Sequence, residues 1–178
     1  MDANTFQISA VKDKGGTISL SDIPVLREKN VWKADPWAAD PDKHLLVRTF
    51  GYWTSIVNTN LVKPQDEPKS FKELTQPKWK GKLIETDPTI SSGSYGAFAT
   101  LLRRNLIDLE TVRALGKNSV AFVPSASEVT RQLIQGNYAV NVVFNPAGYV
   151  SYAGVAGTGL PVKPVAMEEG TVATNRAM

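Results

Sequence analysis

Short apolar runs rich in β-branched or aromatic residues recur along the chain, with polar, glycine or proline turns between them. Runs of this length and composition predict strands. The predicted strands are residues 45–50, 52–57, 83–86, 121–123, 139–144 and 161–165. Gly51 separates the first two runs, so we expect the strand to break there.

Amphipathic segments lie between several of these strands and predict helices at residues 95–104, 108–115 and 128–135. Asp108 is suited to open the second helix, and Gly116 and Gly136 to end the second and third. Strands that alternate with helices predict a layered α/β domain.

A hydroxyl-rich turn at residues 89–94 joins the predicted strand 83–86 to the helix that follows. The first N–H groups of a helix lack internal partners and lie at the positive end of the helix dipole, so they favour ligand oxygens. The residues that would add hydroxyl donors or close backbone approach are Ser91, Ser92, Gly93 and Ser94. Simple capping of the helix by serine is the alternative interpretation.

Two further polar loops follow predicted strands. Ser127 lies in the turn at the start of helix 128–135, and Asn145 directly follows strand 139–144. Ligands in open α/β sheets gather outside the carboxyl ends of strands. We therefore expect the three loops to contribute to one wall of a cleft, with Ser127 and Asn145 as the weaker candidates.

Composition narrows the possible functions. The chain has 178 residues, 42% hydrophobic and 21% charged, which suits one globular domain with a core. Without cysteine it has no disulfide, thiolate metal site or cysteine nucleophile. Six lysines between Lys63 and Lys82 are interspersed with acidic residues, which predicts a solvated surface. No aromatic-rich basic motif indicates nucleic acid binding.

Enzymatic chemistry has weak support in the sequence. His44 is the only histidine, and residues 92–96 read SGSYG, with serine where a nucleophile elbow has its first glycine. No cluster of histidine and acidic residues has metal-site spacing, so we predict no metal and no cofactor. The enzyme alternative that stays open is a small α/β hydrolase that uses a serine within 91–94.

Two motifs in the middle of the chain resemble a known family. Residues 77–82 read PKWKGK and residues 87–93 read DPTISSG. This combination resembles the extracellular solute-binding proteins of bacterial ABC importers, in the group that binds iron, polyamines, thiamine or phosphonates. The resemblance covers about residues 48–172, and its further parts are residues 52–60, 127–139 and 159–171.

The resemblance implies a type II periplasmic-binding-protein-like lobe, in which helices flank a mixed sheet. Residues 1–47 would be part of a first lobe, 48–172 the second lobe, and 173–178 the start of the return to the first lobe. Family members are nearly twice as long, so we expect a fragment or truncated chain. We expect such a fragment to bind solute weakly or not at all, and to associate with further copies of itself.

The family implies a non-enzymatic protein that closes around a small solute and delivers it to an ABC permease. Residues 1–15 have no signal-peptide pattern, which by itself suggests a cytoplasmic protein. The resemblance implies the periplasm or the extracellular space instead. A ligand-sensing domain of a regulator is a further alternative, because regulators use similar lobes.

The ligand is narrowed by one departure from the family. Iron-binding relatives carry two adjacent tyrosines after the strand that matches residues 139–144, whereas this chain has Asn145 and Pro146 there. Tyr149 and Tyr152 lie further on and are not adjacent. This departure disfavours ferric iron. The donor-rich loops favour a solute with carboxylate, phosphate or phosphonate oxygens.

Overall fold

The structure is a computed structural model that describes residues 3–4, 12–17, 19–20, 23–24, 42–44, 47–90, 92–118, 121–144, 159–170 and 172–177. The chain divides into two compact units. The first comprises Met1–Gly51 and Thr174–Met178, and the second Tyr52–Ala173. The interpretation of these units as lobes of a solute-binding protein stays a prediction.

The second unit is built on a mixed sheet with the strand order β6-β2-β5-β3-β4. Its strands are β2 (Val47–Asn58), β3 (Leu83–Thr86), β4 (Ala121–Val123), β5 (Val140–Phe144) and β6 (Val162–Val165). β3 runs parallel to both β4 and β5, whereas β2 is antiparallel to β5 and β6. In the first unit, β1 (Ala3–Asn4) pairs antiparallel with β7 (Val172–Ala177). The predicted mixed α/β fold is confirmed.

The predicted break at Gly51 is wrong, because β2 continues without interruption through that residue. Glycine weakens a strand but can adopt the extended conformation, so pairing with neighbouring strands decides whether it persists. Ile56 and Val57 pair with β5 on one side and with β6 on the other. The boundary between the two units nevertheless falls within β2, after Gly51.

Three helices accompany the sheet: α2 (Ser92–Arg103), α3 (Leu109–Lys117) and α4 (Ala126–Ile134). Asp108 caps α3 by accepting a hydrogen bond from Thr111 N at 2.6 Å. Ser125 caps α4 in the same way, with Glu128 N as donor at 3.2 Å. Both caps satisfy an N–H group that the helix itself cannot pair.

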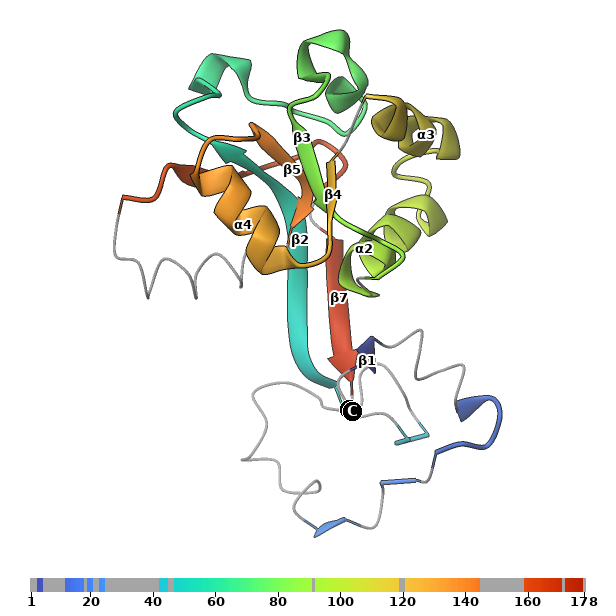
Figure 1. The fold of residues 1–178 in the computed structure, drawn as a ribbon. Helices are drawn as coiled ribbons and strands as arrows, with labels where there is room; N and C mark the ends of the chain where they lie inside the picture. The colour runs from blue at the N-terminus through green and yellow to red at the C-terminus, as the bar shows by residue number, and fades with distance from the viewer. Residues whose placement is uncertain are drawn as a thin grey trace. The chain divides into compact units, whose positions relative to one another are not determined.

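Hydrophobic clusters cover both faces of this sheet, with α2 and α3 on one face and α4 on the other (Figure 1). The first cluster includes Trp53, Val57, Leu83, Ala97, Leu101, Leu115, Val140 and Val142. The second includes Ile56, Ile84, Val129, Leu133 and Val162. Because side chains alternate along a strand, Leu83 and Ile84 serve opposite faces, and Glu85 returns to the face of α2.

The PKWKGK motif has a structural role before β3. It follows the short 3-10 helices η3 (Pro64–Asp66) and η4 (Glu73–Thr75) and forms a third, η5 (Pro77–Trp79). Trp79 is only 5% exposed and belongs to the core. Gly81 has φ +72°, a left-handed conformation that favours glycine, and its N–H bonds Asn118 O. The motif therefore leads the chain into β3 and places the Trp79 indole in the core.

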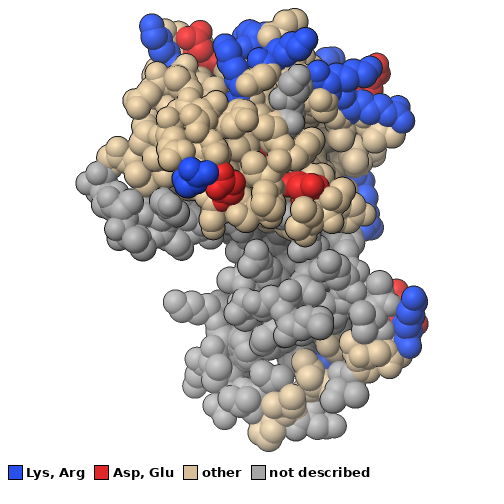
Figure 2. Space-filling model, in the orientation of Figure 1, with Lys and Arg blue, Asp and Glu red and all other residues tan. Residues whose placement is uncertain are grey.

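The six lysines between Lys63 and Lys82 are all exposed, and basic residues gather over the short helices and α3 in Figure 2. Lys78 pairs with Glu73 at 2.6 Å and lies 5.3 Å from the centre of the Trp79 ring. The predicted solvated surface is confirmed for these side chains.

Candidate functional site

The strands that precede the three candidate loops point in the same direction. β3 is parallel to β4, with Thr86 opposite Val123, and parallel to β5, with Ile84 opposite Asn141. Their carboxyl ends therefore lie at one edge of the sheet. α2 begins after β3, and α4 begins after β4. This edge carries the N-termini of two helices, where unpaired N–H groups favour negative oxygens.

The first loop turns sharply after β3. Asp87 Oδ1 accepts hydrogen bonds from Thr89 N at 2.8 Å and from Thr89 Oγ1 at 2.6 Å. These bonds hold the pKa of Asp87 below its ordinary value. An Asx-type turn of this kind confirms Asp87 as a turn former, as its position before Pro88 indicates. The turn directs the chain toward Ser92, where α2 begins.

Gly93 lies in the first turn of α2, directly against an aromatic ring. A Cβ atom at this position would lie 2.5 Å from Cη2 of Trp53. Trp53 is on β2 and is 9% exposed, so its ring has little room to move. Glycine is therefore required for the start of α2 to pack on the sheet.

Ser94 is 1% exposed, and its hydroxyl donates a hydrogen bond to Glu85 Oε1 at 2.8 Å. Ser91 is outside the described residues, as is the side chain of Ser92, although the backbone of Ser92 opens α2. The prediction that residues 91–94 contact a ligand stays a prediction.

Glu85 is the residue that the sequence interpretation missed. Its side chain is 1% exposed, and each carboxyl oxygen accepts two hydrogen bonds. Oε1 accepts from Ser94 Oγ and from Thr86 N, the latter at 2.8 Å. Oε2 accepts from Val143 N at 2.7 Å and from Asn141 Nδ2 at 3.2 Å. The carboxyl group therefore links three elements: β3, β5 and α2.

Burial raises the pKa of Glu85 to about 7, and the hydrogen bonds it accepts oppose that rise. The cost of removing the charge from water thus outweighs the hydrogen bonds. The only signal in the sequence is an acidic residue that follows two apolar residues in a strand, which a half-exposed strand would also show.

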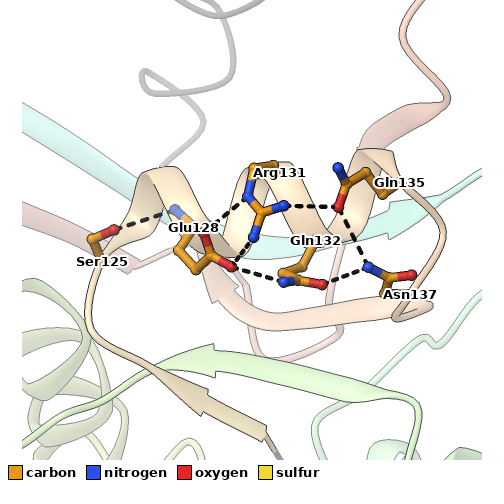
Figure 3. Close-up of polar contacts among 6 residues, drawn as sticks. All are labelled: Ser125, Glu128, Arg131, Gln132, Gln135 and Asn137. Carbon is orange, nitrogen blue, oxygen red and sulfur yellow. Dashed lines mark hydrogen bonds and ion pairs between the residues drawn. The ribbon is translucent and has the colours of Figure 1, made fainter.

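The second loop presents Ser127, which is exposed in the first turn of α4. The outer face of α4 is covered by a polar network (Figure 3). Glu128 bonds Arg131 and Gln132, and Arg131 also bonds Gln135. Ser125, rather than Ser127, accepts the capping hydrogen bond of this helix.

The third candidate, Asn145, lies outside the described residues. β5, which leads to it, ends at Phe144. Two exposed apolar side chains also flank the first loop: Ile90 is 66% exposed and Tyr95 is 57% exposed. The sequence predicted Tyr95 as the first residue of the helix, whereas α2 begins three residues earlier, at Ser92, and Tyr95 is the fourth residue.

A cavity of about 370 Å³ lies elsewhere, near the amino ends of β3 and β5. It is lined by Lys82 and Ala139, which precede these strands, and by Trp79, among others. Within the described ranges, no three histidine or acidic side chains are arranged to hold a metal ion. His44, which a serine hydrolase would need, belongs to the first unit and bonds Thr17 Oγ1 at 2.9 Å.

Three parallel strands whose carboxyl ends share one edge of the sheet make the second unit an α/β domain of the kind in which ligands commonly bind at that edge. Residues 14–178 match the family described as bacterial extracellular solute-binding protein, and the chain belongs to that family. A comparison with curated protein sequences gave no match.

Solved structures show the same fold. Iron-bound HitA from Pseudomonas aeruginosa has a TM-score of 0.77 and 15% identity, over 98% of this chain and 55% of that one. The periplasmic binding protein AfuA from Actinobacillus pleuropneumoniae, with fructose 6-phosphate bound, has a TM-score of 0.74 and 23% identity, over 99% of this chain and 55% of that one. The ferric binding protein from Campylobacter jejuni has a TM-score of 0.70 and 15% identity, over 98% of this chain and 57% of that one. The chain thus spans little more than half the length of these structures.

Family membership confirms the predicted class and location. Proteins of this family are described as bacterial extracellular solute-binding proteins, a non-enzymatic class. None of the helices in the described ranges is long and apolar enough to cross a membrane. Nothing found supports the predicted self-association.

Proposed function

We propose that the second unit supplies one wall of the binding site for an oxyanion-bearing solute, which an ABC permease then imports. The observation that carries the proposal is the shared direction of β3, β4 and β5, which brings the starts of α2 and α4 to one sheet edge. The contacts we assign to the wall come from Ser91, Ser92, Gly93 and Ser94, with smaller contributions from Ser127 and Asn145.

The chemistry of this edge suits negatively charged oxygens. Free N–H groups at a helix start donate to oxygen, and the helix dipole adds a favourable field. Gly93 lets the first turn of α2 pack against Trp53, which holds these N–H groups in place. Because the Ser94 hydroxyl is bonded to Glu85, Ser94 contributes through its backbone N–H. Tyr95 and Ile90, exposed beside the loop, offer an apolar border for the carbon part of the solute.

Ferric iron is the second candidate, because two of the compared structures are an iron-bound protein and a ferric binding protein. AfuA, of similar TM-score, holds fructose 6-phosphate instead, which carries a phosphate group. The absence of adjacent tyrosines after β5 favours the phosphate-type ligand over iron. The hydrolase alternative has no support from the family.

A thermal-shift screen of the protein tests this proposal. We expect phosphate, methylphosphonate, fructose 6-phosphate or a small dicarboxylate to raise the melting temperature, because a ligand that binds only the folded state stabilises it. At a ligand concentration of 100 times Kd, the gain in unfolding free energy is about 2.7 kcal/mol. Spermidine and ferric citrate should give no rise.

Citrate alone is the matched control for the ferric sample, since it carries carboxylates of its own. A rise with spermidine, or with ferric citrate but not with citrate, would reject the oxyanion assignment. Hydrolysis of generic esters or phosphoesters that is lost on substituting Ser92 by alanine would instead support the enzyme alternative.

A further inference from the structure

We propose that Glu85 is a positioning residue for the solute site: its buried carboxyl group fixes the start of α2 and the end of β5 relative to β3. The inference rests on the proposed function, because these two segments carry the candidate contacts 91–94 and 145. The evidence is the set of hydrogen bonds that meet at this one side chain.

Among the described residues of α2, Ser94 bonds Glu85, from Oγ to Oε1 at 2.8 Å. Ser94 lies in the first turn of α2, one residue after Gly93, which packs against Trp53. The first turn is thus held from two sides, by a ring on β2 and by a carboxyl group on β3. Its N–H groups have a defined direction only while both contacts persist.

The other carboxyl oxygen reaches β5. Val143 N donates to Oε2 at 2.7 Å, two residues before Asn145, and Asn141 Nδ2 donates at 3.2 Å. Asn141 Nδ2 also donates to Ile84 O at 2.9 Å, which fixes the orientation of its amide. One carboxyl group therefore sets the spacing between two of the three candidate loops.

If packing were the only requirement, a hydrophobic residue could fill the same space without the free-energy cost of removing a carboxyl group from water. A buried carboxyl group contributes little net stability, because its removal from water offsets its hydrogen bonds. Its effect is to specify geometry, since four donors aimed at two oxygens admit few arrangements. The described residues that bond it, on β3, β5 and α2, are all uncharged.

Amide hydrogen exchange on the protein tests the link to α2 without any ligand. The amides of Gly96, Ala97 and Phe98 close the first hydrogen-bonded turn of the helix. In Ser94→Ala we expect their exchange to accelerate roughly three- to tenfold, the range that one net hydrogen bond represents. The matched control is Thr100→Ala, which removes a hydroxyl bond to Gly96 O inside the same helix and leaves Glu85 untouched.

Two variants at Glu85 separate positioning from a general structural role. In Glu85→Gln the amide nitrogen can donate to Ser94 Oγ while the oxygen still accepts from Val143 N, although the bond from Thr86 N is lost. Both links to α2 and β5 persist, so first-turn protection should be retained. Glu85→Ala removes both links and should lose the protection of the first turn. If Glu85→Ala does not fold, Ser94→Ala against Thr100→Ala decides the question alone.

Affinity supplies the second readout. Titration calorimetry with inorganic phosphate and with fructose 6-phosphate should show about tenfold weaker binding in Ser94→Ala, as lost preorganisation predicts, and wild-type affinity in Thr100→Ala. If neither probe binds the wild type, the oxyanion proposal fails while the exchange measurement still decides the role of Glu85. Equal exchange at Gly96, Ala97 and Phe98 in Ser94→Ala and wild type would overturn the positioning role.

Discussion

At the scale of single residues, Glu85 has the largest consequence for pH dependence. Burial raises its pKa in the folded protein to about 7, above the ordinary value of 4.5. The folded state then binds this proton more tightly than the unfolded state between these two pH values. The contribution of protonated Glu85 to the free energy of unfolding is therefore complete below about pH 4.5 and is lost as the pH rises to about 7.

We predict that Glu85→Gln removes this loss of stability with rising pH. In the wild type the group should lower the free energy of unfolding by about 3 kcal/mol between pH 4.5 and 7.5, as a shift of this size implies. Urea denaturation across that range measures it. The control is Glu128→Gln. Because the hydrogen bond with Arg131 lowers the pKa of Glu128, this variant should keep the decrease of unfolding free energy between pH 4.5 and 7.5. An unchanged slope in Glu85→Gln would mean that Glu85 is ionised throughout.

A matched pair of glycine substitutions tests the contact between α2 and β2. Gly93→Ala places a methyl group into the Trp53 ring and should destabilise the protein by about 1–3 kcal/mol. Gly116→Ala in α3 meets nothing within 4 Å and should stabilise it by up to about 1 kcal/mol, the helix preference of alanine. Thermal unfolding of both variants compares them directly. Stabilisation by Gly93→Ala would show that the first turn of α2 is not seated on Trp53.

At the scale of helices and strands, the sequence predicted those boundaries that depend on neighbouring residues. The strands at 83–86 and 121–123 have the predicted bounds, and α3 begins directly after its predicted cap, Asp108. α2 is different: it starts at Ser92, three residues earlier than predicted. Gly93 and Gly96 disfavour a helix, so the prediction began after the first of them. Packing of Gly93 on Trp53 and the bond from Ser94 to Glu85 override that preference.

The helix caps give a prediction at this scale. Asp108→Ala removes the acceptor of Thr111 N, and Ser125→Ala removes the acceptor of Glu128 N. Each should cost about 1 kcal/mol of stability, measured by chemical denaturation. Asp108→Asn keeps an acceptor and should stay close to wild type, which distinguishes capping from loss of charge. Equal losses in the alanine and asparagine variants would contradict the capping role.

At the scale of the whole molecule, the proposed function depends on a sheet edge rather than on any one motif. The family is that of bacterial extracellular solute-binding proteins. The predicted rise in melting temperature with oxyanions belongs to this scale, because it requires several segments at once. Ser91→Ala combined with Ser92→Ala should reduce that rise, whereas Thr100→Ala should not. If the double variant shows the full rise in melting temperature, the serine hydroxyls do not contact the ligand and only the backbone N–H groups do.

The sequence by itself determined the α/β class, most strands, the Asp108 cap and the family, because each follows from neighbouring residues or from a contiguous motif such as PKWKGK. Only the tertiary structure decided that β3, β4 and β5 are parallel and that Ser94 turns inward to Glu85. These depend on residues far apart in the chain: Glu85 meets Val143 across 58 positions. Periodicity reports which residues are buried, but not which partners they meet.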